Sequence, residues 1–144
     1  MDQPDYAALA AAALEARSLA YVPYSHFAVG AAVLTSSGRI FRGANIENAA
    51  YPMTMCAERV ALFNAYAANE RKIVAIAVVT PTDDVASPCG ACRQVMWELA
   101  GNTTVVLLNT HGQQWITTMK ELLPHGFGPT QLEEASRSSD REGL

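Results

Sequence analysis

A continuous run of apolar and β-branched residues near the middle of the chain limits the fold more than any other feature. Residues 73–80 read IVAIAVVT, and a proline follows them directly. An apolar run of this length that stops at a turn residue is typical of a strand covered on both faces. We therefore expect a central strand in a sheet that has helices on both faces.

The segments on either side of this run have the patterns of helices and further strands. Helical composition occurs at residues 6–19, 56–70, 90–100 and 118–122, and strand patterns occur at residues 27–35, 39–42, 104–108 and 114–117. Asp5 is the expected cap of the first helix, and the spacing of Val60, Phe63 and Ala67 predicts the buried face of the second. A hairpin followed by helical crossovers predicts an α/β fold with a mixed sheet.

Length and composition limit the domain organisation and the class of partner. The chain has 144 residues, of which 50% are hydrophobic, so we expect one domain at residues 1–132. Residues 133–144 are polar without an apolar period, which predicts a disordered tail. The net charge of −4 argues against polymeric nucleic acid as a partner. The acidic N-terminus and the short apolar run at residues 7–14 favour a cytoplasmic protein without membrane association.

Three cysteines stand at the predicted starts of two helices. Cys56 opens one helix, while Cys89 and Cys92 flank the first turn of the next. A helix N-terminus stabilises a thiolate, and thiolates favour zinc. Three protein ligands leave one tetrahedral position open, which is the pattern of a catalytic zinc site. Glu58 is the carboxylate nearest in sequence, but it can face the metal only if Cys56 lies at or before the first helical residue.

The cysteine pattern taken alone is compatible with other kinds of protein. A structural zinc site completed by His26, His111 or His125 would use the same three cysteines. A disulfide within the CxxC pair would instead indicate a thiol redox protein. A zinc-stabilised binding module differs from an enzyme at Glu58, because only the enzyme needs that carboxylate for turnover.

Three short stretches surround these residues: CAE at residues 56–58, PCGAC at 88–92 and NIENAAYP at 45–52. Together they resemble the small homotetrameric cytidine deaminases, and the likeness extends from Tyr24 to Pro129. Cys56 stands where many relatives have histidine, which matches the all-cysteine branch of that family. The resemblance implies a three-layer α/β/α cytidine deaminase-like fold with a central mixed sheet of about five strands.

The resemblance also implies a reaction and its catalytic groups. Cytidine and 2′-deoxycytidine would be hydrolysed to uridine and 2′-deoxyuridine with release of ammonia, a step of pyrimidine salvage. Cys56, Cys89 and Cys92 would hold one Zn²⁺ in each subunit, and water activated by it would attack C4 of the base. Glu58 would carry protons from that water to ring N3 and to the leaving amino group.

Three thiolates outweigh the charge of the zinc ion, so we expect a hydrogen-bond donor beside the sulfurs. Similar enzymes use the position of Arg59 for this purpose, and Arg93 and Gln94 are further candidates because they follow Cys92 directly.

The resemblance implies further residues that bind the substrate. Asn45 and Glu47 would bind the ribose hydroxyls, and the charge of Glu47 would disfavour a 5′-phosphate. Phe27 and Phe127 would pack on the pyrimidine. The remaining expected contacts are Asn48, Ala49, Tyr51 and Ala57.

In this family the homotetramer shares its active sites, and Ala49, Tyr51 and Phe127 reach a neighbouring subunit. Deaminases of nucleoside antibiotics such as blasticidin S share the chemistry and are the nearest alternative. The intact NIEN run at residues 45–48, together with Phe127, favours cytidine.

Overall fold

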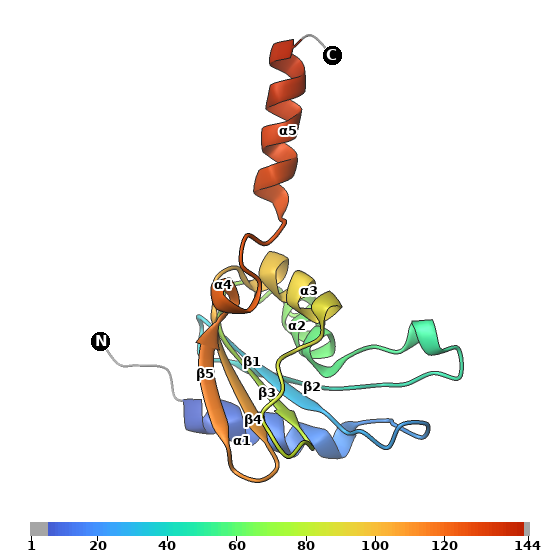
Figure 1. The fold of residues 1–144 in the computed structure, drawn as a ribbon. Helices are drawn as coiled ribbons and strands as arrows, with labels where there is room; N and C mark the ends of the chain where they lie inside the picture. The colour runs from blue at the N-terminus through green and yellow to red at the C-terminus, as the bar shows by residue number, and fades with distance from the viewer. Residues whose placement is uncertain (1–5, 143–144) are drawn as a thin grey trace.

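A five-stranded mixed sheet forms the centre of the molecule (Figure 1), which the computed structural model describes over residues 6–142. The strand order is β2-β1-β3-β4-β5. The strands are β1 (Gly30–Thr35), β2 (Ile40–Ala44), β3 (Ile73–Thr80), β4 (Thr104–Asn109) and β5 (Gln114–Thr118). β3 and β4 are parallel, and the other neighbouring pairs are antiparallel. The predicted mixed sheet is confirmed, with the β-branched run as its central strand.

Helices cover both faces of this sheet and give the expected three layers (Figure 1). The helices are α1 (Tyr6–Ala16), η1 (Arg17–Leu19), η2 (Tyr51–Met53), α2 (Ala57–Ala67), α3 (Gly90–Ala100), α4 (Met119–Leu122) and α5 (Pro129–Glu142). Within residues 6–142, no helix combines the length and the apolar character needed to cross a bilayer. Asp5, the expected cap of α1, lies outside the described residues.

Strand β3 contributes to two separate hydrophobic clusters, one on each face of the sheet. Ile76 and Val78 pack in the cluster that includes α2 and α3, whereas Ala77 and Val79 pack in the cluster that includes α1. Successive side chains of a strand point to opposite faces, so a strand buried on both sides must be apolar throughout. This explains why the run at residues 73–80 has no polar alternation.

The buried face of α2 differs from the one predicted from spacing. Phe63 and Ala67 are exposed and Val60 is only partly buried. The buried residues of the helix are Ala57, Glu58, Ala61, Leu62 and Ala65. Three of these five residues are alanines, and the backbone atoms of Ala57 and Ala61 lie against β2.

Gly43 is the residue that permits this close approach. A Cβ atom on Gly43 would lie 2.3 Å from the backbone nitrogen of Ala61 and 2.6 Å from the carbonyl oxygen of Ala57. Both neighbours are backbone atoms and cannot rotate away. The contact therefore fixes the position of the first turn of α2 relative to the sheet.

The last described residues form a helix. Helix α5 runs from Pro129 to Glu142 and crosses the boundary predicted between residues 132 and 133, where a disordered tail was expected. A proline in the first helical position and the helix formers that follow it favour this helix. Because this segment has no regular spacing of apolar residues, the helix has no apolar face to bury. Residues 129–137 are all exposed, and α5 projects away from the sheet (Figure 1).

We predict that Gly43→Ala destabilises the protein, because the added methyl group must displace the backbone of α2. Overpacking of this kind costs about 3 kcal/mol. For a chain of this size that cost lowers the melting temperature by about 6–12 °C. Calorimetry of Gly90→Ala provides the control, since a Cβ there meets only the flexible end of Arg93 at 3.8 Å. Equal melting temperatures for Gly43→Ala and the unmodified chain would contradict the prediction.

Candidate active site

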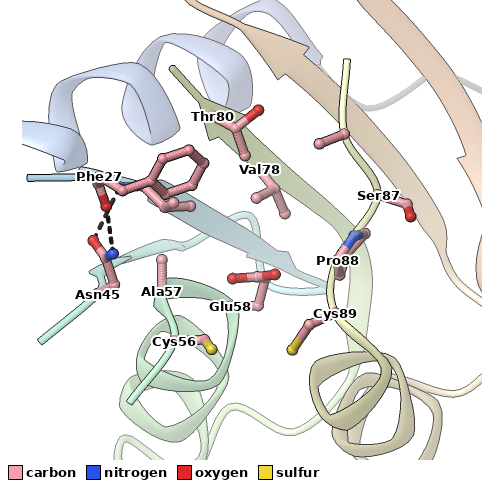
Figure 2. Close-up of a pocket in the computed structure, with 12 residues that line it drawn as sticks. Phe27, Asn45, Cys56, Ala57, Glu58, Val78, Thr80, Ser87, Pro88 and Cys89 are labelled. Carbon is pink, nitrogen blue, oxygen red and sulfur yellow. Dashed lines mark hydrogen bonds between the residues drawn. The ribbon is translucent and has the colours of Figure 1, made fainter. Parts of the chain in front are cut away.

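Two helix N-termini bring three cysteine sulfurs together. Cys56 directly precedes α2 and Cys89 directly precedes α3, both with extended backbone (φ −77°, ψ 153° and φ −62°, ψ 164°). Cys92 lies in the first turn of α3. The three Sγ atoms lie within 4.8 Å of one another. Because Cys56 precedes the first helical residue, Glu58 can lie on the same side as the sulfurs, as Figure 2 shows.

These three cysteines fit a zinc ion. Tetrahedral Zn–S bonds of about 2.3 Å place two sulfurs about 3.8 Å apart, a separation compatible with the arrangement of the three Sγ atoms. No histidine among residues 6–142 joins this group of ligand atoms, and all three cysteines are free thiols. Cys56, Cys89 and Cys92 therefore form a zinc-binding triad that leaves a fourth tetrahedral position for a ligand from outside the chain.

The sulfurs differ in their tendency to ionise. The pKa of the Cys56 thiol is lowered, first because the Cys92 thiol donates a hydrogen bond to it and further because the Arg59 guanidinium donates another. The Arg59 Nη2 atom lies 3.3 Å from the Cys56 Sγ atom. The pKa of the Cys92 thiol is raised, because this thiol holds the shared proton and is buried. The Cys56 thiol thus ionises before the Cys92 thiol.

The other two expected donors point elsewhere. Gln94 donates a hydrogen bond from Nε2 to the carbonyl oxygen of Phe127 at 2.8 Å. Arg93 donates from Nη1 to the carbonyl oxygen of Leu122 at 2.8 Å. Arg93 therefore attaches the end of α4 to α3, and Gln94 attaches the segment after α4 to it. The positive charge at the sulfurs comes from Arg59.

Glu58 is a buried carboxylic acid beside the sulfurs. Its side chain comes from the first turn of α2, and the residue is 5% exposed. The pKa of Glu58 is raised to about 7, mainly by burial and in smaller part by the negative charge of Cys56. A carboxyl group with this pKa can both accept and release a proton near neutral pH.

A cavity of about 310 Å³ opens over Glu58 and two of the sulfurs (Figure 2). This volume lies in the range of small-molecule sites. Phe27, Asn45 and Ala57 line it, as does the segment 86–88, which lies across from Phe27. The Asn45 amide donates to the carbonyl oxygen of Phe27 at 2.7 Å and accepts from the backbone nitrogen of Val29 at 2.9 Å. Asn45 thus holds the segment directly before β1, which carries Phe27.

Several predicted substrate residues lie outside this cavity within one chain. Glu47 lines a neighbouring hollow with Tyr51, and its carboxylate accepts hydrogen bonds from Ser25 and from the backbone nitrogen of Tyr24. The Ser25 hydroxyl is the main reason that the pKa of Glu47 is lowered. The Asn48 side chain accepts from the backbone nitrogen of residue 50 at 2.8 Å and so shapes a turn. Asn48, Ala49, Tyr51 and Phe127 do not line the cavity.

The sequence analysis missed the cavity residues contributed by β3 and by the loop after it. Val78 and Thr80 line the cavity, followed by Ala86, Ser87 and Pro88. The position of Thr80 could have indicated this part of the cavity. Thr80 is the last residue of β3, and ligands of α/β proteins bind at the carboxyl ends of sheet strands.

We predict that Arg59→Gln weakens zinc binding, because it removes the positive charge beside the Cys56 sulfur. Loss of a group that supports a metal ligand typically lowers metal affinity by about 10–100-fold. Competition with a chromogenic chelator measures this change. Arg71→Gln is the matched control, since its guanidinium packs over the Tyr66 ring away from the sulfurs. Equal zinc affinity in the two variants would show that the Arg59 contact contributes nothing to metal binding.

Comparisons of the sequence with known proteins all give similarity to cytidine deaminases. Residues 4–108 match the family model described as the cytidine and deoxycytidylate deaminase zinc-binding region. The cytidine deaminase of Halalkalibacterium halodurans is 54% identical over 123 residues, which cover 85% of this chain and 93% of that protein. The cytidine deaminase of Sporosarcina psychrophila is 48% identical over 133 residues, which cover 92% of this chain and 98% of that protein.

Solved structures agree with these sequence matches. The crystal structure of cytidine deaminase from Burkholderia pseudomallei superposes with a TM-score of 0.83 at 50% identity, covering 85% of this chain and 99% of that chain. The cytidine deaminase structure from Mycobacterium tuberculosis gives a TM-score of 0.75 at 36% identity, with coverage of 88% and 99%. The similarity therefore extends over nearly the whole length of the relatives.

Proposed function

The chain belongs to the cytidine and deoxycytidylate deaminase family, and we propose that it hydrolyses cytidine and 2′-deoxycytidine to uridine and 2′-deoxyuridine with release of ammonia. One observation carries this proposal. The buried carboxyl group of Glu58 lies beside a zinc-binding cysteine triad in a cavity that suits a small molecule. A structural zinc module would have no need for an ionisable group buried there, because burying a carboxyl group without a function costs free energy.

Glu58 carries the protons of the reaction. When bound, zinc with three protein ligands supplies a Lewis acid with a free coordination position, which activates water as a nucleophile toward C4 of the base. Glu58 takes a proton from the attacking water and delivers it to ring N3. It then takes the second proton, from the hydroxyl group newly bonded to C4, and passes it to the C4 amino group. The C4–N bond breaks, ammonia leaves, and the oxygen on C4 becomes the carbonyl oxygen of uridine. A pKa of about 7 allows the same carboxyl group to serve in both directions.

The cavity and the hollow beside it divide the nucleoside between them. The flat base packs against Phe27, a residue that is 41% exposed and lines the cavity. Asn45 and Glu47 bind the ribose hydroxyls. The lowered pKa of Glu47 keeps this carboxylate charged, so a 5′-phosphate is repelled and the free nucleoside is preferred.

We also propose that the protein is cytoplasmic. Its three cysteines are free thiols, and the reducing cytoplasm keeps thiols in this form.

Two arms of the chain support a homotetramer with shared active sites. Residues 20–29 and 45–55 project together to one side of the sheet (Figure 1), and bridges between Tyr21 and Ile46 and between Ile46 and Met55 hold them in place. Exposed apolar side chains cover the arms: Tyr21, Tyr24, Phe27, Ile46, Tyr51 and Met53. Large exposed apolar surfaces mark sites of protein association. On packing against another copy, Ala49, Tyr51 and Phe127 complete the cavity of a neighbour.

We predict that Glu58→Gln keeps one zinc per chain but loses about 10²–10⁴-fold in kcat, because general acid–base catalysis contributes about that much. The assay follows the ultraviolet absorbance change of cytidine and the ammonia released, with metal content measured on the same samples. Full activity in Glu58→Gln would rule out the proton-carrying role. A zinc-loaded unmodified chain that leaves cytidine intact would contradict the proposed activity itself and would turn attention to aminated nucleoside antibiotics.

Mixed oligomers test the shared sites. Phe127→Ala and Glu58→Gln are each expected to have low activity alone. Random mixing should restore about one quarter of the sites, those in which an intact Glu58 meets an intact Phe127 from its neighbour. The measurement is the rate of cytidine turnover after co-refolding equal amounts, with each parent refolded alone as the control. A rate no higher than that of the parents would argue against sites shared between subunits.

A further inference from the structure

The wall of the cavity that lies across from Phe27 is a loop without regular structure. Residues 81–88 join β3 to α3, and Ala86, Ser87 and Pro88 of this loop line the cavity (Figure 2). In the described part of the chain, no backbone-to-backbone hydrogen bond joins this loop to the sheet or to a helix. Its position therefore depends on side chains.

Thr82 connects the loop to the end of β3. Its Oγ1 atom lies 2.8 Å from the Oγ1 atom of Thr80, and it donates a hydrogen bond to the carbonyl oxygen of Asp84. A hydroxyl group has a single proton, so Thr82 accepts from Thr80 while it donates to Asp84. Thr80 is 7% exposed, which shields its hydrogen bond from water. Two hydroxyl groups in sequence thus connect the strand to the middle of the loop.

Asn109 connects the same loop to the next strand. It is the last residue of β4 and pairs in register with Thr80. Its Nδ2 atom donates to the carbonyl oxygen of Asp83 at 2.9 Å. Its Oδ1 atom accepts from the backbone nitrogens of His111 at 3.1 Å and Gln113 at 2.9 Å, which fixes the orientation of the amide. Asn109 is buried, so these hydrogen bonds are costly to break.

We propose that Thr82 and Asn109 are positioning residues that set the distance between the loop wall and Phe27. Neither residue lines the cavity or the hollow that contains Glu47. Their effect passes through Ala86, Ser87 and Pro88. The inference rests on the proposed function, because it assigns this wall to the binding of the nucleoside.

This arrangement separates substrate binding from proton transfer. Glu58 is held by α2, and Cys89 is held by the first turn of α3, where the Arg93 backbone nitrogen donates to the Cys89 carbonyl oxygen at 3.0 Å. Neither attachment involves Thr82. Releasing the loop should therefore weaken substrate binding while the metal site and the proton-carrying group remain in place.

Thr82→Val tests the proposal, because valine keeps the shape of threonine and removes its hydroxyl group. We expect KM for cytidine to rise by about 10-fold, the effect of losing one or two hydrogen bonds, with kcat within about 2-fold of the unmodified chain. Zinc content should stay at one per chain. Hydrogen exchange followed by mass spectrometry should show faster exchange across residues 81–88. Thr82→Ser restores the hydroxyl group and should return both KM and exchange close to their original values.

Thr110→Val is the matched control, since Thr110 is exposed in the turn after β4 and has no side-chain hydrogen bond among those described. Unchanged exchange in residues 81–88 of Thr82→Val would overturn the proposal, as would equal KM values for Thr82→Val and Thr110→Val. If the unmodified chain does not convert cytidine, the proposed function fails instead, and the exchange data still decide whether Thr82 holds the loop. If Thr82→Val does not fold, Thr82→Ala removes the same hydroxyl group and takes its place.

Discussion

The N-termini of α2 and α3 meet beside the central strand, and the chemistry of the site depends on this meeting. Each helix begins directly after a cysteine, so the unpaired backbone N–H groups of both first turns lie near the sulfurs. The position of α2 is set by the backbone contact at Gly43. The position of α3 follows from the parallel pairing of β3 and β4, which requires a crossover helix between them.

The site balances negative charge with few groups. Three sulfurs and one carboxyl group gather in a small space, and Arg59 supplies the positive charge that contacts a sulfur. Burial is the main reason that the pKa of Glu58 is raised to about 7, so its carboxyl group exchanges protons at neutral pH. The hydrogen bond from Cys92 lowers the pKa of the Cys56 thiol, which therefore ionises readily. Neighbouring groups thus set the pKa values of Glu58 and Cys56, as the proposed chemistry requires.

Local sequence signals predicted the elements that carry the metal ligands. The bounds of β3 and α3 agree with the prediction, and Cys56 lies before its helix, as a shared metal face requires. Local sequence signals do not predict features that depend on contacts between distant parts of the chain. The buried face of α2 is decided by Gly43 on another element, and Gln94 bonds to the segment around Phe127, which lies far along the chain. The proposed roles of Tyr51 and Phe127 involve a neighbouring subunit, so one chain alone does not decide them.

The central claim is that three thiolates and an external ligand complete the zinc site beside Glu58. X-ray absorption spectroscopy at the zinc edge of the purified protein tests this claim most directly. The account predicts three sulfur neighbours at about 2.3 Å and one oxygen at about 2.0 Å. Four protein ligands, with a histidine nitrogen or a fourth sulfur in place of the oxygen, would contradict it, because a closed zinc site leaves no position for the attacking water.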